Sequence, residues 1–428
     1  MSILGGVPTT TVRPVPAAGQ PSRAAADQKR LTRSYRVLKV APTAFFSDYG
    51  CHVRILEETR ALQRLGHQVV ICTYHPGSDP AGVCVRRALN TPWWRTVRVG
   101  SSRRKFFYDF WLLLKTFETA LAFRPDIIHA HLHEGALIGS LVGRVLGVPV
   151  VFDFQGSLTS EMVDHRFLDP ASFWYRPLRL LEWVIDHWAA VIVTSSRNAA
   201  EILTREFGYP RARVRTIPDC VDATTFRPRW LRSDLEKIQD LRGRLGIPPD
   251  RKVVVYLGLL AEYQGTGLLL EAARRLIGRG LPVHFLIMGF PAEDYYRHRA
   301  EELGIGPFVT FTGRISYALA PDYLLVGDVA VSPKLSETEG NGKLLNYMAC
   351  GLPTVAFDTP VAAEILGDAG VYARAGDPDS LARCLGELLT DPERASALGR
   401  RLRRRAEAYF SWDWAALQFL ELYKELVG

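Results

Sequence analysis

The sequence predicts an α/β protein with two doubly wound parallel sheets, each in a domain of its own. Short β-branched runs alternate with helical stretches from Tyr35 onward, as in VLKVAP, VRILEETRALQRLG and HQVVICTY. A second series with the same alternation begins at KVVVYLG. The 428 residues allow two to four domains, since one domain takes about 100–200 residues. We therefore expect two α/β domains that face each other across a cleft.

Composition and charge exclude several classes of protein. The chain is 47% hydrophobic and 23% charged, and no apolar run reaches the roughly 18 residues that a membrane span needs. The six cysteines form no CxxC pair and no charged-then-apolar leader opens the chain, so we expect neither a disulfide scaffold nor a zinc ribbon. A cytoplasmic location fits these features, and the net charge of +8 allows an anionic partner.

Five segments are expected along the chain. Residues 1–33 are rich in Pro, Ala and Gly without apolar periodicity, which predicts a disordered leader. Residues 34–228 form the first domain and 249–407 the second, joined by a proline-flanked, charged linker at 229–248. Residues 408–428 contain FSWDWAALQFLELY, a predicted helix that could bridge back to the first domain.

The turn after the strand DVAVSP carries the strongest candidate site, because ligands of open parallel sheets bind beyond the carboxyl ends of the strands. There SPKLSETEGNGKLLNYMACG places two acids, a glycine turn and lysines just before a helix. Glycines allow close approach of backbone, the helix start offers unpaired N–H donors, and lysine adds a full positive charge, which together suit a diphosphate. A capped helix beside a solvated acidic loop is the alternative. The residues are Lys334, Glu337, Glu339, Gly340, Asn341, Gly342 and Lys343.

These motifs resemble the family 4 glycosyltransferases, also called glycosyl transferase group 1. The likeness covers nearly all the chain after the leader, from YGCHVRILEETRALQRLGHQVVICTY through PDIIHAH, GVPVVFDFQGS, IPDCVDATTFRP and VSPKLSETEGNGKLLNYMACGLPTVAFD to FSWDWAALQFLELY. The resemblance implies the GT-B fold, with two Rossmann-like domains. It also implies transfer of a sugar from a nucleotide diphosphate sugar with retained configuration, without a metal or other cofactor.

The resemblance also implies roles for individual residues. Glu337 or Glu339 is expected at the donor sugar, Asn346 at the ribose, and Lys334 and Lys343 at the diphosphate. We expect Glu337, Glu339 and Lys343 to be the catalytic residues. The donor side is completed by Gly258, Gln264, Gly289, Phe290, Gly313 and Arg314 with the turn Gly340, Asn341 and Gly342, and the acceptor side by Gly50, Cys51, His131 and Gln155.

Four positions depart from the family's pattern. Leu259 and Gln264 stand where an arginine and a lysine usually contact the diphosphate. Asn346 replaces a glutamate, and Gln155 replaces a histidine. One hypothesis is an enzyme in which Lys343 and the helix start supply the positive charge that the leaving phosphate needs. The others are a sugar-nucleotide-binding or scaffold protein without turnover, and a sugar-nucleotide epimerase of similar frame.

His129, His131 and His133 in HAHLHEG invite a metal interpretation. Residues two apart on a strand share a face, but no carboxylate pair with ligand spacing follows them. We therefore predict no metal site here and expect a helix cap or an acceptor-side wall.

A basic and aromatic block from Trp93 to Lys115 is typical of a helix at an anionic membrane surface. FWYRPLRLLEWVI could extend this surface, or both stretches could pack on the first domain. The membrane interpretation implies a lipid-linked or polysaccharide-precursor acceptor and a peripheral location at the inner membrane face. No nucleic-acid-binding pattern is present, so no such partner is expected. The residues proposed to meet the membrane are Trp93, Trp94, Arg95, Arg98, Arg103, Arg104 and Lys105.

Overall fold

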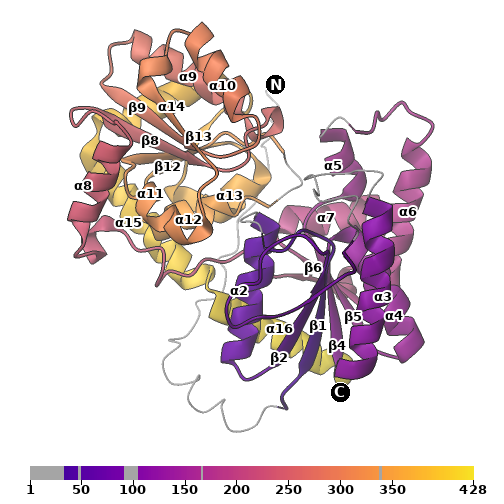
Figure 1. The fold of residues 1–428 in the computed structure, drawn as a ribbon. Coiled ribbons are helices and arrows are strands. Elements are labelled where there is room, and N and C mark those ends of the chain that lie inside the picture. Colours follow the sequence, from indigo (N-terminus) through magenta and orange to yellow (C-terminus); the bar gives the residue numbers. More distant parts are fainter. Residues whose placement is uncertain (1–32, 47–49, 91–104, 165–166, 337–339) are drawn as a thin grey trace, which may run out of the picture. The chain divides into compact units, whose positions relative to one another are not determined.

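A computed structural model describes residues 33–46, 50–90, 105–164, 167–336 and 340–428. Within Ser34–Gly428, the described strands form two separate sheets in which all pairs are parallel (Figure 1). This confirms the predicted α/β class with two doubly wound domains. None of the described helices combines the length and the apolarity that a membrane span requires.

The first sheet has seven strands in the order β3-β2-β1-β4-β5-β6-β7. The order reverses between β1 and β4, which pair directly, and such a reversal opens a crevice at the carboxyl ends of the strands. The strands are β1 (Arg36–Ala41), β2 (Gln68–Thr73), β3 (Cys84–Arg87), β4 (Ile127–His131), β5 (Val150–Phe154), β6 (Val191–Thr194) and β7 (Val214–Thr216). The helices are α2 (Gly50–Arg64), α3 (Lys105–Phe123), α4 (Leu132–Leu146), α5 (Leu158–Asp164), α6 (Tyr175–Trp188) and α7 (Arg197–Glu206).

The second sheet has six strands in the order β10-β9-β8-β11-β12-β13, with the same reversal between β8 and β11. Its strands are β8 (Lys252–Leu257), β9 (Val283–Met288), β10 (Val309–Gly313), β11 (Val329–Ser332), β12 (Thr354–Phe357) and β13 (Val371–Ala373). Its helices are α8 (Leu235–Arg244), α9 (Thr266–Gly278), α10 (Glu293–Glu302), α11 (Ala320–Leu324), α12 (Lys343–Ala349), α13 (Pro360–Leu366), α14 (Pro378–Thr390) and α15 (Pro392–Tyr409).

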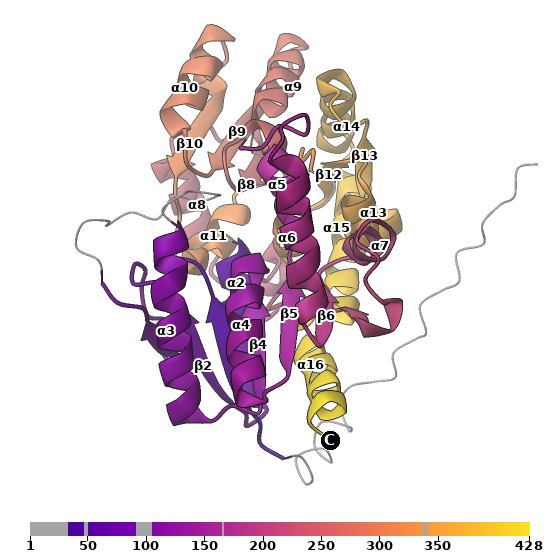
Figure 2. The same ribbon diagram turned by 90° about the vertical axis from the view of Figure 1, so that its right-hand side faces the viewer.

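Helices cover both faces of each sheet, which explains why the strands read as nearly continuous apolar runs. On the first sheet, α3, α4 and α6 pack on one face, while α2 and the last helix, α16 (Trp412–Val427), pack on the other (Figure 2). Phe419 and Tyr423 of α16 are fully buried against Val37 and Val151 of β1 and β5. The chain therefore ends on the first domain after it has completed the second.

Two expected segment boundaries differ from the structure. The expected linker 229–248 contains α8, and Ile238 and Leu241 of that helix lie in the core of the second domain. The polar residues of this stretch occupy the exposed side of an amphipathic helix, so most of the segment belongs to the second domain. The expected boundary at 408 falls inside α15, which continues to Tyr409.

Candidate active site

A cleft of about 440 Å³ lies where the carboxyl ends of both sheets meet. Its walls are the turns that follow β1, β4 and β5 of the first domain and β8, β9 and β11 of the second. This is the location at which doubly wound folds bind ligands, because the strand order reverses there.

Most of the residues singled out in the sequence line this cleft. Gly313 ends β10 outside the lining, and His131 is fully buried behind it. Glu337 and Glu339 lie outside the described residues. The expected residues that do line the cleft are Gly50, Cys51, Gln155, Gly258, Gln264, Gly289, Phe290, Arg314, Lys334, Gly340, Asn341, Gly342, Lys343 and Asn346.

Lys343 brings a positive charge to the turn that follows β8. Its Nζ donates a hydrogen bond to Gln264 Oε1 at 2.6 Å and lies 4.9 Å from the centre of the Tyr256 ring. A Cβ on Gly258 would stand 2.9 Å from this ammonium nitrogen, so the lysine side chain would have to shift if residue 258 were larger. Lys343 thus reaches across from α12 to the residue that replaces the expected lysine.

The glycine turn before α12 is held from within the second domain. Lys334 is nearly buried, and its Nζ donates to the carbonyl oxygen of Gly340 at 2.7 Å. On the first-domain side, a Cβ at Gly340 would lie 2.9 Å from Asp219 Oδ2. The turn therefore passes so close to Asp219 that a side chain at residue 340 would force a displacement.

The turns after β9 and β10 bring an arginine onto an aromatic ring. The guanidinium carbon of Arg314 lies 5.4 Å from the centre of the Phe290 ring, within the range of a cation–π contact. Gly289 precedes this phenylalanine, and a Cβ there would approach the carbonyl oxygen of Gly258 to 2.0 Å. The turns after β8 and β9 can therefore lie in contact only because residue 289 has no side chain.

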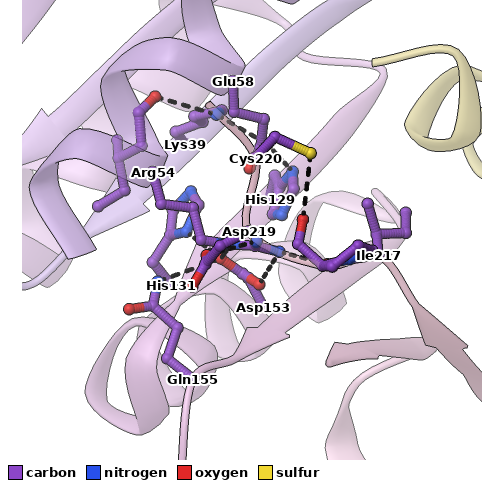
Figure 3. Close-up of polar contacts among 12 residues, drawn as sticks. Lys39, Arg54, Glu58, His129, His131, Asp153, Gln155, Ile217, Asp219 and Cys220 are labelled. Carbon is purple, nitrogen blue, oxygen red and sulfur yellow. Dashed lines mark hydrogen bonds and ion pairs between the residues drawn. The ribbon is translucent and has the colours of Figure 1, made fainter. Parts of the chain in front are cut away.

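On the acceptor side, Arg54 of α2 organises the wall, and the sequence analysis did not identify it. Its Nε and Nη2 bind the two oxygens of Asp153 at 2.9 Å each, and its Nη1 binds Asp219 Oδ1 at 2.9 Å (Figure 3). Burial alone would raise the pKa of Asp153, but the Arg54 guanidinium holds it well below its usual range. The sequence signal that could have identified Arg54 is its position between apolar residues of the first described helix.

Behind this wall, His129 and His131 of HAHLHEG join a buried polar network (Figure 3). His131 Nδ1 lies 2.8 Å from Asp153 Oδ2, and His129 Nδ1 lies 2.7 Å from the Tyr423 hydroxyl. Lys39 Nζ donates to Glu58 Oε1 at 2.8 Å. Burial lowers the pKa of His129 to about 3, so this imidazole is neutral.

The network does not fit a metal, although potential ligand atoms of Glu58, His129, His131 and Asp153 lie within 4.8 Å of one another. The spacing of residues after the histidines could not reveal this cluster, because Glu58 and Asp153 come from α2 and β5 and not from the histidine motif. Lys39 and Arg54 already neutralise these two acids. A divalent ion would add positive charge beside two carboxylates whose negative charge Lys39 and Arg54 already balance.

His133 lines the cleft and forms a second buried cluster. Its Nε2 lies 3.6 Å from Glu182 Oε1 and 3.5 Å from Asp186 Oδ1. Burial would lower the pKa of His133, but these two carboxylates outweigh it and raise the pKa to about 9. Near neutral pH the ring is therefore an imidazolium that faces both carboxylates.

Lys105, expected at the membrane, instead lines the cleft. Its Nζ pairs with Glu134 Oε1 at 2.9 Å, and Glu134 stands in the first turn of α4. The ion pair with Glu134 holds the side chain of Lys105, the first residue of α3, on the side of the cleft. The other basic and aromatic residues proposed for the membrane, 93–104, lie outside the described residues.

Two α/β domains with parallel sheets and a cleft at the strand ends define the GT-B class of proteins. Solved structures share this architecture. Sucrose-phosphate synthase from Thermosynechococcus elongatus superposes with a TM-score of 0.77 at 19% identity, covering 92% of this chain and 99% of the other. Anabaena HepE in complex with UDP-glucose has a TM-score of 0.73 at 17% identity and covers 92% and 100%.

Sequence comparison adds the family. The family described as glycosyl transferases group 1 matches residues 237–405, and glycosyltransferase family 4 matches residues 50–225. D-inositol 3-phosphate glycosyltransferase 2 of Catenulispora acidiphila is 27% identical over 402 residues, or 88% of this chain and 90% of the relative. A sulfoquinovosyl transferase of Arabidopsis thaliana is 24% identical over 91% of this chain and 73% of its own. The chain belongs to the family 4 glycosyltransferases and is a glycosyltransferase.

Proposed function

We propose that the protein transfers a sugar from a nucleotide diphosphate sugar to an acceptor hydroxyl held by the first domain, with retained configuration. The observation that carries this proposal is the Lys343 ammonium, which lies in the cleft beside Gln264 and the glycine turn after β8. The similarity to a structure solved with UDP-glucose supports a nucleotide sugar as the donor.

The second domain offers what a nucleotide diphosphate requires. Lys343 and Lys334 supply positive charge for the pyrophosphate, and Lys334 also holds the carbonyl side of the Gly340 turn. The Phe290 ring with Arg314 above it offers a planar surface for a base. Asn346, which lines the same cleft, is placed to bind ribose hydroxyls.

The chemistry needs no nucleophile from the protein. The bond from the anomeric carbon to the leaving phosphate breaks, and the acceptor oxygen forms its bond on the same face. The acceptor proton passes to an oxygen of the leaving phosphate. Lys343 stabilises the negative charge that develops on this phosphate in the transition state. An interaction that strengthens in the transition state lowers the activation barrier. We keep the prediction that no metal is required.

We further propose that the acceptor is lipid-linked and that the protein binds a membrane surface. Phe106 is 76% exposed and directly follows the cleft-lining residue Lys105, and Phe173, which is also 76% exposed, precedes α6. Exposed apolar groups at the rim of an acceptor site are expected where the acceptor carries a lipid tail. Further exposed apolar residues of α3 and of the segment around the start of α6 are Phe107, Phe110, Trp174, Leu180, Leu181 and Trp183. The names of the relatives make inositol phosphate another acceptor to test.

The test uses calorimetry and nucleotide release with UDP-, GDP- and ADP-sugars. We expect one donor to bind, and Lys343→Ala to weaken its binding by about tenfold or more, because a charge-assisted contact to phosphate contributes about 1.5–3 kcal/mol. Release of nucleotide should fall at least as much.

The matched control is Lys252→Ala, which removes an exposed lysine at the opposite end of β8. This variant should keep donor affinity and release. Donor binding without nucleotide release in the presence of any acceptor would favour the scaffold hypothesis. Equal donor affinity in Lys343→Ala and Lys252→Ala would contradict the assignment of Lys343.

A further inference from the structure

The turn that follows β8 is fixed against the turn that follows β11, the strand beside it in the sheet. The backbone nitrogen of Leu335 donates to the carbonyl oxygen of Tyr263 at 2.9 Å. Gly265 has a φ of 75°, and a Cβ there would lie 2.0 Å from the carbonyl oxygen of Pro333. The left-handed conformation and this close approach both require glycine. Backbone contacts on both sides of Gln264 therefore hold this turn in place.

The side chain of Gln264 is 6% exposed and contacts Lys343 in the cleft. Its Oε1 accepts the hydrogen bond of 2.6 Å from the Lys343 ammonium. The fully buried Tyr256 ring also lies near this ammonium, with its centre 4.9 Å from Nζ. The Tyr256 hydroxyl donates to the carbonyl oxygen of Leu259 at 2.6 Å, so the ring is tied to the same turn. Two anchored groups thus hold the ammonium.

Neither of these two groups carries a net charge. An amide oxygen and a phenol ring attract an ammonium through a dipole and a quadrupole, and they do not cancel its positive charge. A carboxylate at residue 264 would hold the lysine as well, but it would also repel a diphosphate. A lysine that is already held loses less rotamer freedom when a phosphate binds.

We propose that Gln264 is a positioning residue, which holds the Lys343 ammonium where the diphosphate of the donor binds and adds no negative charge there. This inference rests on the proposed function, and it gives Gln264 a role that acts through Lys343. An uncharged side chain can in this way support diphosphate binding at a position where the family usually has a lysine.

The first experiment measures the binding of UDP, GDP and ADP, and of their sugars, to Gln264→Met and Gln264→Glu by calorimetry. Gln264→Met keeps the size of the side chain and loses the acceptor oxygen. We expect the dissociation constant to rise about three- to tenfold, which is the factor that ordering one long side chain costs. Gln264→Glu keeps the contact but brings a like charge to the diphosphate, and we expect a rise of about thirtyfold or more.

Thermal melting separates positioning from packing. Gln264→Glu should melt at or above the temperature of Gln264→Met, because its carboxylate still pairs with Lys343, although it binds the donor more weakly. A residue that only packs would rank the two variants in the same order in both measurements. The controls are Gln239→Met and Gln239→Glu at an exposed position of α8 in the same domain, and they should match the wild type in both.

A double-mutant cycle tests whether Gln264 acts through Lys343. The ³¹P line width of the nucleoside diphosphate reports millimolar binding, so it can be followed in Lys343→Ala as well. In that background, Gln264→Met should change the dissociation constant by less than about twofold. Additive effects of the two substitutions would mean that Gln264 meets the donor by itself, and they would overturn the inference.

Equal donor affinity in the wild type and Gln264→Met would also contradict it, as would tighter binding to Gln264→Glu than to Gln264→Met. Failure of the proposed function has a different signature, because none of the three nucleotides or their sugars would then bind the wild type. A donor that binds the wild type and does not respond to changes at residue 264 therefore counts against the inference alone.

Discussion

At the scale of single residues, the Arg54 group shows how the described part of the first domain buries a charge beside its counter-charges. Arg54 and Asp153 are almost completely buried and bind through two hydrogen bonds of 2.9 Å. A buried charge without a partner is costly. Replacing one member of such a pair therefore destabilises the protein mainly because the other charge stays buried without compensation. The Arg54 group also fixes the loop that carries Asp219 to the cleft.

Replacing this arginine should destabilise the protein strongly. Arg54→Met leaves Asp153 buried with less compensation, and we expect a loss of about 3–5 kcal/mol in the free energy of unfolding. Denaturant titration measures this loss. Arg205→Met is the control, since Arg205 is 77% exposed and its i,i+4 partner Glu201 is 53% exposed, and it should cost at most about 0.5 kcal/mol. Equal losses in the two variants would show that the buried group adds no stability.

The pKa of His133 predicts a dependence of stability on pH. Glu182, Asp186 and Glu134 face this ring, and they raise its pKa from 6.5 to about 9 against the effect of burial. A raised pKa stabilises the folded state fully below pH 6.5, and the contribution disappears as pH rises through about 9. It amounts to about 3 kcal/mol at most.

Denaturant titrations between pH 6 and pH 10 test this prediction. The wild type should lose stability across the upper part of that range, and His133→Gln should show a flatter profile. Identical slopes for the two proteins would mean that His133 does not hold its proton more tightly in the folded state.

At the scale of elements, α3 joins the cleft to an exposed apolar surface. Its first residue, Lys105, lines the cleft, while Phe106, Phe107 and Phe110 are more than half exposed. Tyr108 and Leu112 of the same helix are buried, so packing on the sheet uses only one side of it. The packing interpretation therefore holds for one face of this helix, and the exposed face is the one that the proposed membrane contact would use.

This helix should determine membrane binding. Phe106→Ser combined with Phe110→Ser is expected to lower sedimentation with anionic lipid vesicles by about tenfold or more, because each inserted Phe contributes about 1.5–3 kcal/mol. The control Tyr295→Ser removes a 61% exposed aromatic residue of α10 in the second domain. Unchanged binding of the double variant would count against the membrane proposal.

At the scale of the whole molecule, contacts between the two domains complete the cleft. Glu364 of α13 accepts hydrogen bonds from the backbone nitrogen of Arg197, at 2.9 and 3.1 Å, and so caps α7 of the first domain. Asp219 approaches the Gly340 turn, and α16 ends on the first sheet. The walls of the cleft thus come from segments more than 100 residues apart in the chain.

The sequence by itself determined the fold class, the two parallel sheets and most of the residues that line the second-domain side of the cleft. The alternation of strands and helices is a local pattern, and the residues that follow strand ends in a doubly wound sheet must face the crevice. For this reason Gly258, Gly289 and the residues from Gly340 to Lys343 were found without coordinates.

Only the tertiary structure decided which charged and polar side chains contact one another. Arg54 with Asp153 and Asp219, Lys105 with Glu134, and Lys343 with Gln264 pair across 29 to 165 positions of the chain. No local period encodes such pairs, because they depend on how whole helices and strands pack against one another. An ion pair forms only when two charged groups lie a few ångströms apart. The tertiary structure sets this distance, and it therefore decides whether a lysine faces a membrane or a cleft.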